Sequence, residues 1–384
     1  MVLYFSVFKV MQRPLPGRNI LTNPSGCYNL FNLLSQKRGA HNMGSVKDLI
    51  VLSSPHEEKP GRGKFIFSDR YSVFDWGEMP DHIPLKGASL CLIGAYFFEQ
   101  LERAGFLTHY QGIEEEGKNK RLFELKNPAN EMVVSLVRTI QPPEIEGKYD
   151  YNIYQGIRGN FLIPFEFIYR NSLPAGSSLR KRLERGEVKL KDYGWDRIPA
   201  PEERLSPPVV DVSTKLEEQD RYLSWQEVEE TGILQKEEIE EIRRTVLAID
   251  GLITKEVERI NLKNEDGKIE LAFDKDRNLM VVDVVGTPDE SRYTFRGIHL
   301  SKEIAREFYR KTSWFEEVEK AKLQNPVGWR GLVKASPPPL PSSLVQLISW
   351  VYQRIAMDLT ERNWFSDVPS LEEIGERISQ ELLI

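Results

Sequence analysis

Short blocks of β-branched and aromatic residues, separated by turn-rich segments, dominate the first half of the chain. The blocks LIVLSS (49–54) and KFIFSD (64–69) flank the segment HEEKPGRG, and EMVVSLVRTIQPP and FLIPFEFIYRNS follow further along. This pattern is typical of β-strands joined by turns, and we expect another strand in KRLFELKN (120–127). Residues 89–104 instead place apolar side chains at helical spacing and stop at a glycine, which predicts a helix.

The second half of the chain has mainly helical patterns. Apolar residues recur every three or four positions over 236–257, which predicts a helix. The runs KIELAF (268–273) and NLMVVDVV (278–285), separated by DKDRN, predict a β-hairpin. Two further helical regions are expected around 301–322 and 342–360, interrupted by the tract SPPPLP because proline blocks helix continuation. This order of elements favours an α+β fold over a parallel doubly wound sheet.

Segments rich in proline, glycine and polar residues mark loops and domain boundaries. Residues 174–208 are predicted to form a long functional loop with short helical pieces. The SPPPLP tract is better explained as a linker than as a polyproline ligand for another domain. The expected divisions are a flexible extension or translated upstream sequence (1–42), a β-rich nucleotide-binding lobe (43–140), an α+β substrate and metal lobe (141–325) and a helical C-terminal extension (326–384).

Length and composition exclude several classes of protein. The 384 residues fit two or three domains, and the net charge of −6 provides no basic field to hold nucleic acid. Cys27 and Cys91 are too few for a disulfide framework, and the five histidines lack metal-ligand spacing. No apolar run reaches the roughly 18–20 residues of a membrane span, and the apolar N-terminus lacks the basic segment of a signal peptide. We therefore expect a cytoplasmic protein.

Two motifs have the residue types of a nucleotide or metal site. GRGK (61–64) resembles a phosphate-binding loop, but a strand follows the lysine where that motif needs a helix, so a hairpin turn is the better interpretation. Glu270 and Asp283 lie on adjacent strands of the predicted hairpin, where the two-residue period can point both carboxylates to one face. Two carboxylates without histidine or cysteine suit Mg²⁺. Two unrelated exposed acids are the alternative.

Two further segments combine charge with turns. YRNSLPAGSSLRKRL (169–183) places Arg170 at a strand end, before a small-residue turn that enters a basic helix. Backbone amides, serine hydroxyls and an arginine form a phosphate-binding arrangement, although an ordinary N-capped helix explains the segment equally well. SDRYSVFDW (68–76) groups acids and an arginine among aromatic residues, and a surface pair of Asp69 and Arg70 is the simpler explanation.

Taken together and in this order, the segments resemble the phosphoribosylaminoimidazole-succinocarboxamide synthase (SAICAR synthetase) family. The matching segments, spread over roughly residues 44–315, are SDRYSVFD (68–75), IPLKG (83–87), THY (108–110), YRNSLPAGS (169–177), STKLEEQDR (213–221), GLI (251–253), KIELAF, VVD and TPDESR (287–292). Each motif alone is weak, and their collinear order makes the match fairly specific.

The sequence departs from the family pattern at several positions. The family's G-K-x-K on the first strand is Gly44-Ser45-Val46-Lys47 here, so only Lys47 remains. Its acidic pair is Asp283-Val284, and Ala272 replaces a glycine. These departures leave open a related ATP-dependent carboxylate–amine ligase, or a nucleotide-binding paralogue, with a different acceptor.

The resemblance implies a two-lobed α+β fold, with an antiparallel β-rich nucleotide lobe and a larger, ATP-grasp-like α+β lobe. It implies an ATP- and Mg²⁺-dependent ligase of de novo purine biosynthesis. This enzyme joins L-aspartate to 5-amino-1-(5-phospho-D-ribosyl)imidazole-4-carboxylate through an acyl phosphate and gives SAICAR, ADP and phosphate. The implied partners are these small molecules, with no nucleic acid and no membrane, and a homo-oligomer is allowed.

The resemblance also implies roles for individual residues. The catalytic group is Asp283, Glu270 and Lys215; the ATP-binding residues are Lys47 and Lys86; the Mg²⁺ ligands are Glu270 and Asp283. The substrate-binding residues are Asp69, Arg70, Ser72, Arg170, Ser177, Asp220, Arg221, Asp289, Ser291 and Arg292.

Overall fold

The first half of the chain forms an antiparallel six-stranded sheet. The computed structural model describes residues 41–43, 46–201, 203–326 and 328–382, so expectations for residues 1–40 lie outside the described residues. The strands, in spatial order, are β1 (His41–Met43), β2 (Lys47–Ser53), β3 (Gly61–Phe67), β7 (Glu131–Leu136), β5 (Tyr110–Glu115) and β6 (Lys118–Lys120). Because β1 pairs with β2, residues 41 and 42 belong to this sheet and not to an extension.

The predicted strands at 49–54 and 64–69 are confirmed as β2 and β3. GRGK (61–64) opens β3, so it does not form a phosphate-binding loop. The strand expected over 120–127 is wrong: after the end of β6 the chain turns into the 3-10 helix η1 (Leu122–Glu124). Glu99 on the neighbouring helix accepts a hydrogen bond from the Leu122 amide at 2.8 Å. This tertiary contact cannot be read from local propensity.

The larger sheet is mostly antiparallel and carries the predicted hairpin. Its spatial order is β12 (Tyr222–Leu223), β11 (Val209–Thr214), β10 (Phe161–Arg170), β13 (Lys263–Phe273), β14 (Leu279–Val282) and β4 (Leu107–Thr108), while β15 (Ser291–Phe295) also pairs with β13 and with β16 (Ile298–His299). A short separate hairpin joins β8 (Glu144–Ile145) to β9 (Lys148–Tyr149). Only the β14–β4 pair is parallel among the named strands of the described chain. The α+β prediction is thereby confirmed.

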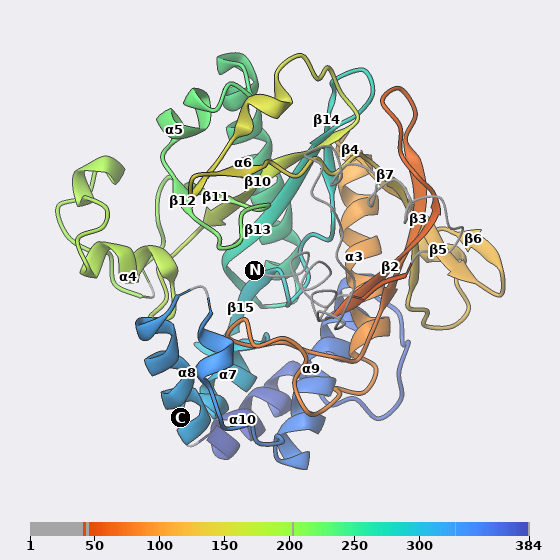
Figure 1. Cartoon of the computed structure of the whole chain (residues 1–384). Helices are drawn as coiled ribbons and strands as arrows, with labels where there is room; N and C mark the ends of the chain where they lie inside the picture. Colours follow the sequence, from red (N-terminus) through yellow and green to blue (C-terminus); the bar gives the residue numbers. More distant parts are fainter. Residues whose placement is uncertain (1–40, 44–45, 202, 327, 383–384) are drawn as a thin grey trace, which may run out of the picture.

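Helix α3 (Lys86–Arg103) packs between the two sheets, contacting β3, β5 and β7 on one side and β4 on the other (Figure 1). It begins three residues before the predicted start, because a distant side chain caps it. The Asp69 carboxylate accepts hydrogen bonds from the backbone amides of Leu85 at 3.2 Å and Gly87 at 2.9 Å. Such a cap satisfies amides at a helix start, but its residue lies far from the helix in the sequence.

The helix expected over 236–257 is confirmed as α6 (Lys236–Glu258). Its apolar stripe is fully buried and packs on β13, β10 and β11. The short helix α5 (Trp225–Glu230) precedes it. The long loop expected over 174–208 contains α4 (Ser178–Glu184) and the 3-10 helix η3 (Leu190–Tyr193), as predicted.

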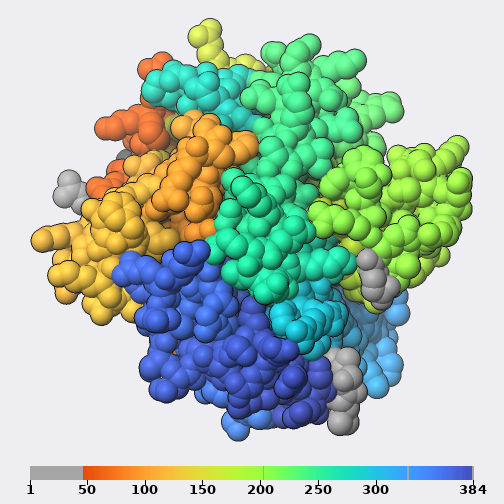
Figure 2. All heavy atoms as spheres, turned by 180° about the vertical axis from the view of Figure 1, so that it is seen from behind, coloured from red at the N-terminus to blue at the C-terminus, as the bar shows by residue number. Residues whose placement is uncertain are grey.

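The C-terminal segment consists of helices that pack on both lobes. They are α7 (Glu303–Tyr309), α8 (Ser313–Gln324), α9 (Ser342–Thr360) and α10 (Leu371–Leu382), with the 3-10 helix η4 (Trp329–Leu332) before the SPPPLP tract. Helix α9 lies along α3, and Figure 2 shows the blue C-terminal segment against both the orange and the teal parts of the chain. Helix α10 was not predicted, although its buried residues follow helical spacing: Leu371, Ile374, Ile378 and Leu382.

Candidate active site

A buried ion pair joins the two sheets at the predicted hairpin. Glu270 lies on β13 opposite Val282, and Asp283 immediately follows β14 with a left-handed φ of 64°. The Lys47 ammonium, on β2 of the smaller sheet, donates to Asp283 Oδ1. Both side chains are almost completely buried. The hairpin therefore presents its acids to the smaller sheet, and two unrelated exposed acids are excluded.

Two further lysines neutralise Glu270. Its Oε1 atom lies 2.5 Å from Lys215 Nζ and 3.0 Å from Lys268 Nζ. Glu166 on β10 faces Glu270 across the strand pair, and its Oε1 lies 3.0 Å from Lys268 Nζ. Directly paired residues on neighbouring antiparallel strands share one face of the sheet, which explains how these charges come together.

The charges of this cluster influence one another through a buried environment. Burial alone would raise the pKa of Glu270, but the ammonium groups of Lys215 and Lys268 lower it well below its ordinary value. The pKa of Asp283 is raised, because burial and the charge of Glu270 outweigh the attraction of Lys47. In a low-dielectric site, an added cation would therefore interact strongly with Asp283.

The oxygen atoms around Asp283 fit a divalent cation such as Mg²⁺. Asp283 Oδ2 and Glu290 Oε2 are buried and accept no hydrogen bond from the described residues. Hard cations prefer such carboxylate oxygens. The described part of the chain holds no cluster of three or more His, Cys, Asp or Glu residues suited to a metal ion. A cation here would therefore need ligands from a substrate or water in addition to Asp283.

A second cluster lies where β10, β13 and β15 run side by side. Asp266 pairs in register with both Arg170 and Arg292, so all three lie in one row. Arg292 Nε donates to Asp266 Oδ1 at 2.7 Å, and Arg170 Nη1 lies 3.4 Å from Asp266 Oδ2. Arg170 Nε also donates to Asp211 Oδ2 at 2.8 Å. Charges of the surrounding acids raise the pKa of Arg170 despite its complete burial, so it stays cationic.

The small-residue turn before α4 approaches these arginines. Arg170 Nη1 lies 3.4 Å from Ser177 Oγ, and Arg170 Nη2 lies 3.1 Å from Ser178 Oγ. A Cβ atom on Gly176 would lie 3.4 Å from Arg292 Nη1 and 3.6 Å from Arg310 Nη2. The turn thus presents hydroxyls and guanidinium groups together, which is the arrangement expected for a bound phosphate or carboxylate.

The predicted site residues of the SDRYSVFDW loop make different contacts. The Asp69 carboxylate caps α3, as described above, and the surface pair of Asp69 and Arg70 is not present. Arg70 instead donates to Asp48 Oδ1 at 2.5 Å. Ser72 is partly buried in the same loop. Lys86, at the end of this region, is buried and donates to Asp289 Oδ2 at 2.7 Å.

Ser291 and Arg221 lie apart from the arginine row. Ser291 Oγ is 3.0 Å from the Tyr169 hydroxyl on the opposite face of the strands from Arg292. A Cβ on Gly267 would lie 2.2 Å from that hydroxyl, so only glycine fits there. Arg221 is half exposed and pairs with Glu217 at 3.0 Å.

Asp220 is a predicted site residue whose carboxyl group ionises near neutral pH. Burial, with a further contribution from the charge of Glu166, raises its pKa to about 7. It lies on the loop after Lys215, whose backbone amide is fixed to the Pro164 carbonyl at 3.0 Å. The N-terminal part of the loop STKLEEQDR therefore contributes Lys215 to the charged cluster.

Several site residues were missed by the sequence reasoning. They are Glu166, Lys268, Glu290, Lys302 and His109. Strand alternation could have identified Lys268, because it lies two residues before Glu270 on β13. His109 could have been found only from the fold: its Nε2 atom lies 3.0 Å from the Asp283 carbonyl oxygen, and burial lowers its pKa to about 4.

Two of the departures from the family pattern lie in the hydrophobic core. Val284 is buried, and its Cγ1 atom would lie 3.0 Å from a Cβ on Gly94 of α3. Its side chain therefore points away from the cluster around Asp283. Ala272 packs with Leu162 and Met280. Ser45 lies outside the described residues.

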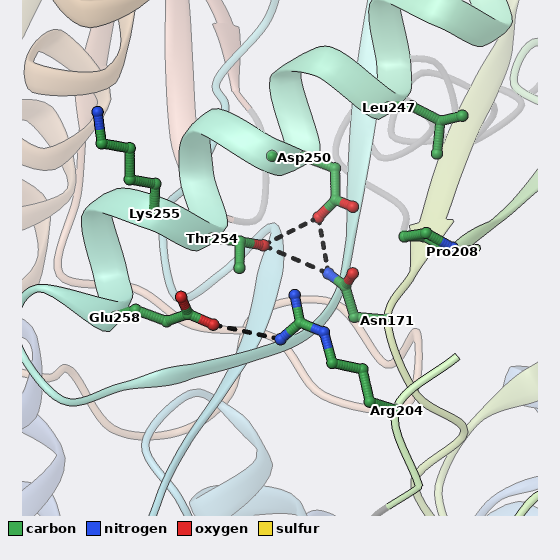
Figure 3. Close-up of a pocket in the computed structure, with 9 residues that line it drawn as sticks. Asn171, Arg204, Pro208, Leu247, Asp250, Thr254, Lys255 and Glu258 are labelled. Atoms are coloured by element: carbon green, nitrogen blue, oxygen red, sulfur yellow. Dashed lines mark hydrogen bonds and ion pairs between the residues drawn. The ribbon is translucent and has the colours of Figure 1, made fainter. Parts of the chain in front are cut away.

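A pocket of about 290 Å³ opens elsewhere, between α6 and the end of β10 (Figure 3). Asn171 donates to Asp250 Oδ1 at 2.7 Å there, and Arg204 pairs with Glu258 at 3.2 Å. None of the nine residues drawn in Figure 3 belongs to the predicted site. The Asn171–Asp250 bond instead anchors the strand end that carries Arg170.

Comparisons with known proteins point to one family. A sequence profile of the SAICAR synthetase family matches residues 43–324, well over half of the chain. The chain belongs to the SAICAR synthetase family. A putative phosphoribosylaminoimidazole-succinocarboxamide synthase of Archaeoglobus fulgidus is 52% identical over 340 residues, covering 88% of this chain and 100% of that protein. The synthase of Thermoplasma acidophilum is 32% identical over 307 residues, covering 78% of this chain and 93% of that protein.

Solved SAICAR synthetases have the same fold. The SAICAR-synthase from Saccharomyces cerevisiae, in complex with SAICAR, aligns with a TM-score of 0.59 at 18% identity over 86% of this chain and 97% of that one. A SAICAR synthetase in complex with ADP aligns with a TM-score of 0.50 at 18% identity over 78% of this chain and 100% of that one. The expected two-lobed α+β fold is confirmed.

As a SAICAR synthetase, the chain is an ATP-dependent carbon–nitrogen ligase of purine biosynthesis. The comparisons do not favour the alternative of a related ligase with a different acceptor. In the described part of the chain, no helix has the length and apolar character needed to cross a membrane.

Proposed function

We propose that the chain joins L-aspartate to the carboxylate of 5-amino-1-(5-phospho-D-ribosyl)imidazole-4-carboxylate at the cluster of Lys47, Glu270 and Asp283. A carboxylate oxygen of the ribonucleotide attacks the γ-phosphorus of ATP and releases ADP, leaving an acyl phosphate. The aspartate amine then attacks the acyl carbon, loses a proton and displaces inorganic phosphate. The products are SAICAR, ADP and phosphate.

The observation that carries this proposal is the buried cluster of lysines and carboxylates between the two sheets. Phosphoryl transfer depends on positioning and charge neutralisation more than on a protein nucleophile. Lys47 would bind ATP phosphates, and Lys215 and Lys268 would neutralise charge that moves from ATP to the new acyl phosphate. Because Glu270 already pairs with both lysines at 2.5 and 3.0 Å, their ammonium groups are held in place before substrate arrives.

Asp283 and Glu270 would hold Mg²⁺, with further ligands supplied by ATP or water. The bound ion supplies charge neutralisation and orientation for the ATP phosphates. The buried oxygen Asp283 Oδ2, which accepts no hydrogen bond from the described residues, supports this assignment. Lys47 would then exchange part of its contact with Asp283 for a phosphate oxygen.

The arginine row would bind the ribonucleotide. Arg292 and the turn around Gly176 and Ser177 offer guanidinium and hydroxyl donors to its phosphate, while Asp266 keeps Arg292 oriented at 2.7 Å. Lys302, whose pKa is lowered by burial and by Arg306, would bind a carboxylate or phosphate close to Glu290. The ribonucleotide would then lie beside the phosphoryl-transfer cluster.

The test is ADP release by the full chain. Release should require ATP, Mg²⁺, the aminoimidazole ribonucleotide and L-aspartate together, and mass spectrometry should identify the succinocarboxamide. Release that is equally fast without the ribonucleotide, or a product that lacks the aspartate mass, would contradict the proposed acceptor. A binding protein without catalysis would release no ADP above the rate of uncatalysed hydrolysis.

A further inference from the structure

A buried hydrogen-bond chain links the C-terminal helix α9 to the candidate active site. The Tyr352 hydroxyl, on α9, donates to Asp289 Oδ1 at 2.5 Å, and Lys86 Nζ donates to Asp289 Oδ2 at 2.7 Å. Tyr352 and Lys86 are each 1% exposed, and Asp289 is 7% exposed. Helix α9 lies outside residues 43–324, to which the family profile matches, so the profile assigns no role to Tyr352.

Both oxygens of Asp289 are used inside the protein. Burial alone would raise the pKa of Asp289, but Lys86 and the Tyr352 hydroxyl lower it to about 2, so the carboxylate is ionised. Lys86 Nζ also donates to the Arg70 carbonyl at 3.2 Å and lies 5.4 Å from the centre of the Tyr352 ring. A charged carboxylate held on both sides has one defined orientation.

Asp289 is placed to transmit that orientation to the residues after it. Glu290 follows directly, and its Oε2 lies 3.3 Å from Lys268 Nζ in the phosphoryl-transfer cluster. Arg292 lies three positions after Asp289 and begins the arginine row with Asp266. A shift of Asp289 would therefore move side chains of both clusters, although Tyr352 itself contacts neither.

The contact of α9 with this region extends beyond Tyr352. The Ser349 hydroxyl, one turn earlier, donates to the Pro84 carbonyl at 2.6 Å, and Gln353 donates to Ser349 Oγ at 2.7 Å. One face of α9 thus docks on the segment that ends at Lys86, and Figure 1 shows α9 beside α3. These contacts fix the position of the Tyr352 hydroxyl, along the α9 axis, relative to Asp289.

We infer that Tyr352 is a positioning residue, which acts through Asp289 to hold the ribonucleotide-binding segment 289–292 in its productive orientation. The inference rests on the proposed function for the identity of the ribonucleotide. Tyr352 touches no substrate in this arrangement, and Lys47, the proposed ATP-binding residue on β2, bonds to Asp283 and to none of Tyr352, Asp289 and Lys86. Loss of the hydroxyl should therefore weaken ribonucleotide binding more than ATP binding.

The test compares the Tyr352→Phe variant with the unaltered chain and with the Tyr96→Phe variant. The Tyr96 hydroxyl, on α3, donates to Glu256 Oε2 on α6 at 2.6 Å, outside the site, so its removal controls for the loss of a tyrosine–carboxylate bond. Tyr352→Phe should raise the KM for the aminoimidazole ribonucleotide about tenfold, the effect of one hydrogen bond to a charged group. The KM for ATP should rise less than that for the ribonucleotide, because Lys47 pairs with Asp283 and makes no hydrogen bond to Tyr352, Asp289 or Lys86.

A double-variant cycle separates positioning from general stabilisation. If Tyr352 acts through Asp289, adding Tyr352→Phe to Asp289→Asn should raise the ribonucleotide KM no further. Fully additive effects, equal rises for ATP and ribonucleotide, or the same change in Tyr96→Phe would overturn the inference. Isothermal titration of the ribonucleotide into each variant supplies the same comparison if turnover is too low to measure. Failure of the unaltered chain to make the succinocarboxamide would contradict the proposed function instead.

Discussion

Asp283→Asn separates the electrostatic role of Asp283 from a packing role, since it removes the charge and keeps the shape. Asp283 is 3% exposed, and its Oδ1 atom pairs with Lys47. Removal of one partner from a buried ion pair typically costs about 3–5 kcal/mol of folding free energy. Here the cost should be smaller, because the raised pKa of Asp283 shows that burial and Glu270 already oppose its charge. We expect a loss of about 1–2 kcal/mol, which lowers the Tm by roughly 1–3 °C in a chain of this size.

The effect on catalysis should be much larger than the effect on stability. Asp283 would orient the cation and Lys47 toward the ATP phosphates, and loss of one preorganised electrostatic group costs about 10²–10³ in kcat, or roughly 3–4 kcal/mol. The assay is ADP release at increasing Mg²⁺, with a melting curve of the same variant. The binding of ADP with Mg²⁺, measured by calorimetry, should weaken in parallel.

Asp276→Asn is the matched control for this experiment. Asp276 lies in the turn of the same hairpin, is 62% exposed at its side chain and pairs with Lys275, so the variant loses the same charge outside the cluster. Its turnover and melting curve should match those of the unaltered chain. Near-normal turnover of Asp283→Asn at low Mg²⁺ would refute the assignment, and a fall in Tm well beyond the range above would show that Asp283 mainly stabilises the fold.

Three further predictions follow from neighbouring residues. Arg292→Lys loses the planar fork that Asp266 orients, so the KM for the ribonucleotide should rise more than that for ATP in steady-state assays; equal rises would move Arg292 to the nucleotide. The pKa of Asp220 in the folded chain, about 7, lies above its ordinary value of 3.8, so the chain loses stability as the pH rises from about 4 to 7. Measured by urea unfolding, Asp220→Asn should therefore be about 2–4 kcal/mol more stable than the unaltered chain at pH 8 and equally stable at pH 4. If the two proteins are equally stable at both pH values, the pKa of Asp220 is ordinary. Val284→Asp, which adds the acid absent at this position, should lose about 3 kcal/mol or more because it buries a charge against Gly94; unchanged stability would place that side chain in the cleft.

The hydrophobic pattern predicted strands and helices correctly where the side chains buried in the fold follow the two-residue or 3.6-residue period of the local sequence. The hairpin of β13 and β14 was predictable because its apolar runs and turn are contiguous, and its two-residue period indicated that Glu270 and Asp283 could point to one face. The start of α3 was not, because its cap is the carboxylate of Asp69, which is separated from the helix by a loop. The segment 120–127 failed for the same kind of reason, since Glu99 rather than local propensity fixes its conformation.

The candidate site was predicted in part, because the family motifs name residues one at a time. The motifs marked Lys215 and Glu270, but the pairing of Glu166 with Glu270 across β10 and β13 depends on strand register. Lys86 shows the limit most clearly. Its position in IPLKG implied ATP binding, and the fold adds a contact with Asp289 beneath α9 that the motif does not show. The sequence alone does not show which distant carboxylate pairs with a buried lysine.

The central claim is that the ribonucleotide carboxylate becomes an acyl phosphate at the Lys47, Glu270 and Asp283 cluster. Labelling both carboxylate oxygens of the aminoimidazole ribonucleotide with ¹⁸O tests this most directly. The proposed reaction transfers one labelled oxygen to inorganic phosphate for each ADP released and leaves the other in the new amide. Phosphate that carries no ¹⁸O while the succinocarboxamide accumulates would contradict the account.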